Sequence, residues 1–67
     1  MNKKWIVILF NSPEKNEIFK IFELNAVKQI SYLLNLDTQI ISNFYHNLIN
    51  PRGILKYCII LQTNLNN

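Results

Sequence analysis

The stretch VKQISYLLNLDTQIISNFY, residues 27–45, decides the fold, because its apolar residues fall where two short helices joined by a tight turn must touch. Ser31 fills the position of closest approach between such helices. Asn35 fills the turn, where positive φ is usual and Asn is the best side chain after glycine. The stretch predicts a helix-turn-helix with these apolar contact positions: Ile30, Leu34, Leu36, Ile41 and Phe44.

Length and composition indicate one small folded domain, residues 1–67. A chain of 67 residues buries only about 60% of the surface that its unfolded form exposes. Half of the residues, 49%, are apolar and they are spread along the chain, which favours a packed core over disorder. Heavy use of Asn, Ile and Lys, with few Ala, Val and Gly, is typical of an AT-rich genome.

The first ten residues, MNKKWIVILF, have the charge and apolar order of a secretory signal, but the apolar run stops after Phe10. This run is shorter than the usual signal segment of about 7–15 residues. No segment approaches the roughly 18 apolar residues of a membrane span. We therefore expect an intracellular protein of the cytoplasm, nucleoid, an organelle or a virus-infected cell, neither secreted nor bound to a membrane.

Two strands are expected before the helices. Residues 5–10 form a continuous apolar run, and residues 17–22 form a second strand after a turn at 11–16 that contains Pro13. Antiparallel pairing of the two as a hairpin is the expected arrangement. The second strand would place Phe19 and Ile21 on one face and, on the other, Ile18, Lys20 and Phe22.

Capping residues predict where the two helices begin and end. Asn25 is the expected N-cap of a first helix over residues 26–34, with Ile30, Leu33 and Leu34 toward the core together with Val27 or Ala26. Asp37 or Thr38 caps a second helix that runs to Leu48 or Ile49, and Pro51 and Gly53 end it. Its inward side consists of Ile41, Phe44 and Leu48.

The last segment, residues 55–63, alternates as a strand does, with Leu55, Tyr57, Ile59 and Leu61 on one face. Residues 64–67 are expected to fray. The order strand, strand, helix, helix, strand predicts an α+β fold (ββααβ), in which a three-stranded antiparallel sheet is packed on one side by the helix pair.

The second helix would enter a DNA major groove if the pair acts as a DNA-binding helix-turn-helix. Gln and Asn pair with adenine, whereas guanine contacts use Arg or Lys, and this helix has neither. We therefore expect a preference for A·T-containing sites, with Gln39 and Asn43 as the main contacts. The alternative is an ordinary helix pair with a solvated polar face. The candidate base contacts are Thr38, Gln39, Ser42, Asn43 and His46.

Phosphate contacts would come from Lys28, Arg52 and Lys56. The net charge of +3 permits an anionic partner such as double-stranded DNA without requiring one. Three cations bind DNA weakly, so specific binding would need a homodimer or a larger assembly. Tyr45 either packs into the core or donates its hydroxyl to the DNA backbone.

An enzyme is the least expected class. The chain has no pairing of His with carboxylate, a single glycine at Gly53 and four scattered acidic residues. The lone cysteine, Cys58, lies in an apolar run and is expected to be an inert buried thiol. We expect no cofactor, no metal and no small-molecule substrate.

A structural or protein-interaction subunit of a ribosome, polymerase or virion is the alternative function. Large exposed apolar groups that cluster mark interaction surfaces. The residues expected to be exposed for such docking are Trp5, Tyr32, Ile40 and Tyr45.

Nearly the whole chain resembles the modular DNA-binding repeat that accompanies homing endonucleases of the GIY-YIG and HNH types, and related modules of phages and large DNA viruses. The resemblance is carried by AVKQISYLLNLDTQIISNFYHNL and the closing segment ILKYCIIL, with Asn35 in place of the usual glycine. It implies sequence-directed DNA contact, as in a transcriptional or architectural regulator, without catalysis by the module itself.

Overall fold

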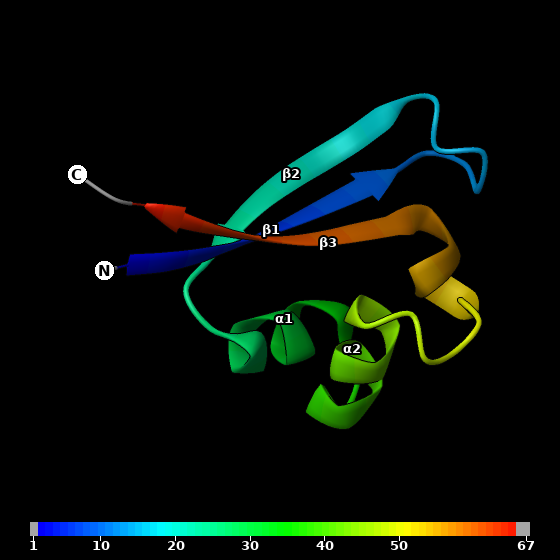
Figure 1. Cartoon of the computed structure of the whole chain (residues 1–67). Coiled ribbons are helices and arrows are strands. Elements are labelled where there is room, and N and C mark those ends of the chain that lie inside the picture. The colour runs from blue at the N-terminus through cyan, green and yellow to red at the C-terminus, as the bar shows by residue number, and fades with distance from the viewer. Residues whose placement is uncertain (1, 66–67) are drawn as a thin grey trace.

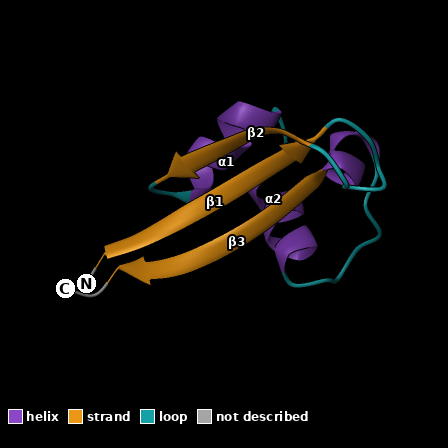
Figure 2. Ribbon diagram, turned by 90° about the horizontal axis from the view of Figure 1, so that it is seen from above, coloured by secondary structure: helices purple, strands orange, loops and turns teal. Residues whose placement is uncertain are grey.

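The computed structural model describes residues 2–65, which form a two-layer α+β fold (Figure 1). The elements follow the predicted ββααβ order, with one added 3-10 helix, η1. Helices α1 and α2 lie on one face of the sheet (Figures 1 and 2). The bounds are β1 Asn2–Phe10, β2 Ile18–Leu24, α1 Val27–Leu34, α2 Thr38–Tyr45, η1 Gly53–Tyr57 and β3 Cys58–Leu65.

The sheet has the order β2-β1-β3, and both pairings are antiparallel. The predicted hairpin between the first two strands is therefore confirmed. Because β1 is central, side chains on both of its faces meet neighbours from both edge strands, which explains its continuous apolar run. Val7, for example, lies opposite Phe22 on one side and Ile60 on the other.

The core lies between the sheet and the helix pair. Three of the predicted helix-turn-helix contact residues, Ile30, Leu34 and Ile41, are buried, while Leu36 and Phe44 are partly buried against the same cluster. Leu33 and Val27 also pack there, as expected. The core residues are Val7, Ile30, Leu34, Ile41, Leu55, Cys58 and Ile60.

The turn between α1 and α2 has the predicted geometry. Asn35 adopts the left-handed conformation, with φ 57° and ψ 47°. The amide of Leu36 donates to the Ser31 carbonyl at 3.1 Å, the closing bond of a Schellman motif. The Ser31 hydroxyl donates to the Leu36 carbonyl oxygen. Ser31 therefore satisfies both backbone groups of Leu36, across the turn.

Asn25 does not cap α1, contrary to prediction. The N-cap is Ala26, which has no capping side chain. The Gln29 side chain instead reaches back and accepts from the Asn25 amide at 2.6 Å, while Asn25 Oδ1 accepts from Lys4 Nζ at 2.9 Å. The prediction was wrong because the Asn25 side chain is engaged by β1. At α2, Asp37 Oδ1 accepts from the Gln39 amide at 3.2 Å, which confirms the predicted cap.

Helix α2 ends at Tyr45, well before the predicted end at Leu48 or Ile49. Asn47 has φ 61°, and its amide donates to the Phe44 carbonyl at 3.1 Å. The Leu48 amide donates to the Asn43 carbonyl at 2.8 Å, which completes a Schellman motif. This reversal leaves Leu48 70% exposed instead of in the core.

The predicted last strand begins with helix. Residues 53–57 form η1, which starts at Gly53 with φ 58° and brings Leu55 into the core. This helical turn shifts the alternation that follows, so Cys58 and Ile60 are buried while Leu61 is exposed. Ile59 and Leu61 share one face of β3, as predicted, but Leu55 and Tyr57 belong to η1 and not to the strand, so the prediction was wrong for these two residues. Strand β3 also continues through residues 64 and 65, which pair with residues 3 and 2, so this part of the expected frayed tail is a strand. The other two residues of that tail, 66–67, lie outside the described residues.

Candidate nucleic-acid interface

The surface of α2 that faces away from the core carries the predicted base contacts. Ile41 is 1% exposed and anchors the inward side. Thr38, Gln39 and His46 are exposed, whereas Ser42 and Asn43 are partly buried. At the 3.6-residue helical period, Gln39, Asn43 and His46 share one side of the helix.

Gln39 and Asn43 are joined by a hydrogen bond. Gln39 Nε2 donates to Asn43 Oδ1 at 3.1 Å, one helical turn away. The bond leaves the Gln39 carbonyl oxygen as an acceptor and the Asn43 amide hydrogens as donors. Adenine presents the complementary pair, an N6 donor and an N7 acceptor, in the major groove. The two side chains thus offer one ordered donor–acceptor pair.

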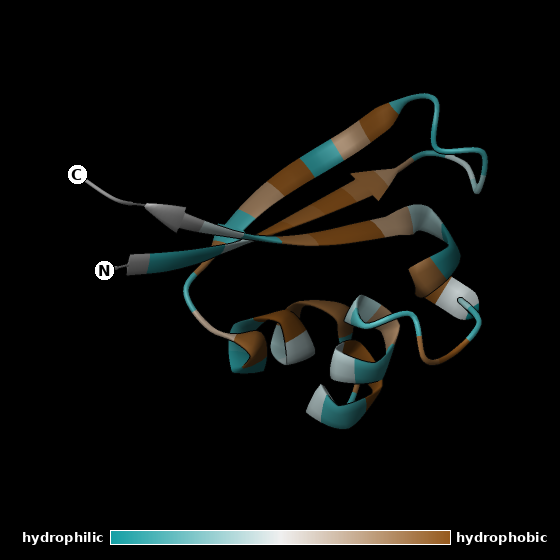
Figure 3. Ribbon diagram, in the orientation of Figure 1, coloured by the Kyte–Doolittle hydropathy of each residue, from teal (hydrophilic) through white to brown (hydrophobic). Residues whose placement is uncertain are grey.

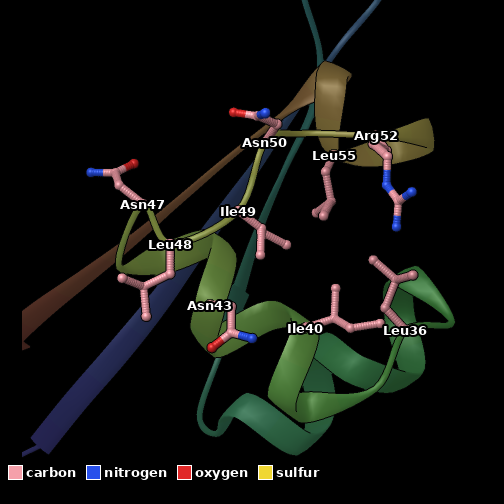
Figure 4. A pocket seen from close by; sticks show the side chains of 9 residues that line it. All are labelled: Leu36, Ile40, Asn43, Asn47, Leu48, Ile49, Asn50, Arg52 and Leu55. Atoms are coloured by element: carbon pink, nitrogen blue, oxygen red, sulfur yellow. The ribbon is translucent and has the colours of Figure 1, made fainter.

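A groove of about 610 Å³ runs beside α2, between the helix and the segment that leads to η1 (Figure 4). Ile40 and Asn43 line it from α2, and Arg52 points into it from the opposite wall (Figure 4). Its full lining is Leu36, Ile40, Asn43, Asn47, Leu48, Ile49, Asn50, Arg52 and Leu55.

The predicted phosphate contacts are only partly brought together. All three side chains are exposed. Arg52 shares the groove with Asn43, whereas Lys28 belongs to α1 and Lys56 to the last turn of η1, and neither lines the groove. Arg52 is therefore the cation best associated with the exposed surface of α2.

The residues considered for protein docking divide into two pairs. The rings of Trp5 and Tyr45 pack edge to face, and both side chains are partly buried against the core. The prediction that these two residues are exposed was therefore wrong. Tyr45 also meets the His46 ring at a centroid distance of 5.1 Å. Tyr32 and Ile40 are exposed, at 74% and 39%, as expected.

Cys58 is buried, as predicted. Burial raises the pKa of its thiol to about 11, and the positive charge of Lys15 opposes this shift in part. The thiol is protonated at neutral pH and is a poor nucleophile. Within residues 2–65, no three His, Cys, Asp or Glu side chains gather in a way that could hold a metal ion. Over the same part of the chain, every helix is too short or too polar to span a membrane.

Several groove residues were not anticipated from the sequence: Asn47, Leu48, Ile49 and Asn50. The predicted second helix, which runs to Leu48 or Ile49, includes or adjoins all four of them. The usable signal was Asn47 followed by an Asn-Pro pair, because Asn tolerates positive φ and residues before proline avoid the helical region.

The chain is similar to a small part of one nematode protein. No family model matches the chain, and no solved structure matches it. The chain is 30% identical over 60 residues to a protein of Caenorhabditis elegans described as probable 3',5'-cyclic-AMP phosphodiesterase pde-4. The match covers 90% of this chain but spans only 9% of the length of that protein.

Proposed function

We propose that this protein is a non-catalytic DNA-binding module that inserts α2 into the major groove of A·T-containing sites. The proposal rests on the hydrogen-bonded Gln39–Asn43 pair on the outward side of α2. One such bidentate amide contact with adenine discriminates against other bases by about 1–3 kcal/mol. This role implies an intracellular compartment. It is also the role that the resemblance to the modular repeats of homing endonucleases implies.

The size of α2 supports this role. A helix with its side chains is about 10–12 Å in diameter, which fits a major groove about 12 Å wide, and the eight residues of α2 extend about 12 Å along its axis. Thr38 and His46 are exposed near the two ends of the helix and flank the amide pair. Asp37 occupies the N-cap, so a negative charge disfavours a phosphate at this end of α2.

The groove supports the A·T preference. Ile40 is partly exposed and lies one turn before Asn43, and both line the groove. An apolar side chain next to an adenine-contacting amide suits the 5-methyl group of thymine. Uracil lacks this methyl group, so replacing thymine by uracil in the bound site should weaken binding by the native chain. The same replacement should change the affinity of the Ile40→Ala variant less.

Phosphate binding would be modest. Three neutralised phosphates give a slope of log affinity against log salt of about −2.7, so affinity falls roughly 40-fold between 50 and 200 mM salt. Arg52→Gln should reduce the slope by about 0.9. It should weaken A·T and G·C duplexes alike, because phosphate contacts carry no base information.

Fluorescence anisotropy with A·T-rich and G·C-rich duplexes tests the proposal. Gln39→Ala and Asn43→Ala should each lower affinity for the A·T site about 5- to 150-fold, the range equivalent to 1–3 kcal/mol, and should reduce the preference between the two duplexes. Tyr32→Ala is the matched control, because Tyr32 is exposed on α1 away from the groove. Its affinity should equal that of the native chain.

Two results would contradict the proposal. The first is the absence of salt-dependent binding to any duplex, which would leave the docking subunit of a larger assembly as the alternative. The second is binding that remains equal for A·T and G·C duplexes and unaffected by substitution of Gln39 and Asn43.

A further inference from the structure

The face of the sheet opposite the helices is apolar and uncovered by the described residues. In Figure 2 the strands lie in front of both helices, so this face is turned toward the viewer. Figure 3 shows apolar residues along the middle of β1 and β3. We call this surface the outer face, and its centre consists of Ile6, Ile8, Ile21, Ile59 and Leu61.

The register places these five side chains together. Val7 is buried under the helices, so its neighbours Ile6 and Ile8 point the opposite way. Ile8 lies between Ile21 on β2 and Ile59 on β3. Leu61 lies opposite Ile6. The apolar surface is therefore continuous across all three strands, and Ile21 and Leu61 are 52% and 46% exposed.

The charge of the outer face is balanced. By strand alternation, its charged side chains are Lys4 and Glu23, which have opposite signs. The cations Lys28, Arg52 and Lys56 belong to the helices and the segment around η1. Two copies with a net charge of +3 each could thus approach through the outer face without net repulsion across it.

The extent of the outer face also limits its occupant. Three strands about 4.8 Å apart, each with seven residues rising about 3.3 Å, span on the order of 300–400 Å² per copy. Two such faces bury less than the roughly 1,200 Å² of a stable interface, which is the range of weak association. The apolar face of a second sheet of the same extent and twist matches this surface, and the chain itself carries one.

We propose that the outer face binds a second copy of this chain, so that two sheets pack face to face in a weak, concentration-dependent dimer. The sheets would lie about 10 Å apart, as in a β-sandwich. The helices of the two copies would then lie on opposite sides of the dimer, away from its interface. The proposal does not depend on DNA binding.

Sedimentation velocity over about 5–500 μM protein tests the dimer. The native chain should shift from monomer to dimer across this range, and sodium sulfate should strengthen the association because it favours apolar burial. Ile21→Lys and Leu61→Lys should each weaken dimerisation at least tenfold. Thermal denaturation at low concentration should show that both variants still fold, since both side chains are exposed in the single chain.

Leu48→Lys is the matched control, because Leu48 is an exposed leucine beside α2, on the other side of the molecule. It should dimerise as the native chain does. A chain that stays monomeric up to about 500 μM would overturn the proposal and assign the outer face to a different partner. A dimer that Leu61→Lys disrupts but Ile21→Lys leaves intact would also overturn it, since that pattern indicates pairing through the β3 edge.

Discussion

The Trp5 ring contacts the Tyr45 ring edge to face, with ring centroids 5.1 Å apart and planes inclined at 71°. Trp5 belongs to the central strand β1, and Tyr45 is the last residue of α2. The pair therefore attaches the end of α2 to the middle of the sheet. Because α2 carries the candidate base contacts, this packing helps to set the direction in which they project.

Replacement of Tyr45 tests this contact. Tyr45→Leu keeps an apolar side chain but removes the ring pair, and should lower the free energy of unfolding by about 0.5–1.5 kcal/mol. Tyr45→Phe keeps the ring and should change it much less. Urea denaturation followed by Trp5 fluorescence measures both variants, since Trp5 is the single tryptophan. Equal stability of the Leu and Phe variants would contradict an energetic role for the ring pair.

Two neighbouring isoleucines on α2 should respond differently to truncation. Ile41 is 1% exposed, so Ile41→Ala should leave a cavity and cost about 2–5 kcal/mol. Ile40 is 39% exposed and lines the groove, so Ile40→Ala should cost much less. Chemical denaturation of both variants checks the difference. Similar losses at the two positions would show that α2 is rotated relative to the arrangement described.

Asn35 should tolerate glycine and resist alanine. Its left-handed conformation is unfavourable for a residue with an ordinary Cβ, so Asn35→Ala should cost about 1 kcal/mol. Asn35→Gly should match the native chain or exceed its stability, because glycine is the preferred residue at this helix end. Thermal denaturation of the pair gives the comparison. An alanine variant as stable as the glycine variant would exclude a left-handed turn.

Cys58 should make stability depend on pH in the alkaline range. The thiol ionises near its ordinary pKa of 9.0 when unfolded, but burial raises the pKa to about 11 when folded. The unfolded chain therefore loses this proton first as pH rises. The contribution to stability is complete below pH 9 and is lost as pH rises toward 11.

Comparison with Cys58→Ala isolates that effect. The variant is expected to be less stable at neutral pH because it lacks a buried sulfur atom, yet its stability should decline less between pH 9 and 11. Urea midpoints at several pH values measure the difference. Parallel pH profiles for the two proteins would mean that the thiol ionises equally in both states.

The helix pair was predictable because its apolar spacing is redundant. Ile30, Leu34 and Ile41 each satisfy the helical period and the contact between helices, and all three are buried. The turn followed from Asn35, whose backbone preference agrees with its neighbours. Where local preference and apolar pattern agree, sequence alone indicates the structure.

The errors occurred where asparagine and a short 3-10 helix interrupt these periods. Asn47 fits a helix interior as well as a left-handed stop, so the sequence did not show that α2 ends before Leu48. Likewise, η1 separates Leu55 from the alternation of β3, so Leu55 is buried together with Cys58 and Ile60, and not on the face of Ile59 and Leu61. The groove depends on both interruptions, so its walls could not be predicted from periodicity.

The pairing of β1 with β3 brings residue 2 opposite residue 65, and Figure 2 shows these two strand ends side by side. Distant parts of the sequence thus meet at one point of the sheet. A short linker from residue 65 to residue 2 would make a circular permutant, with new termini opened in the exposed turn at residues 11–16. Such a rearranged chain should keep the same core, because every strand pairing and helix contact is retained.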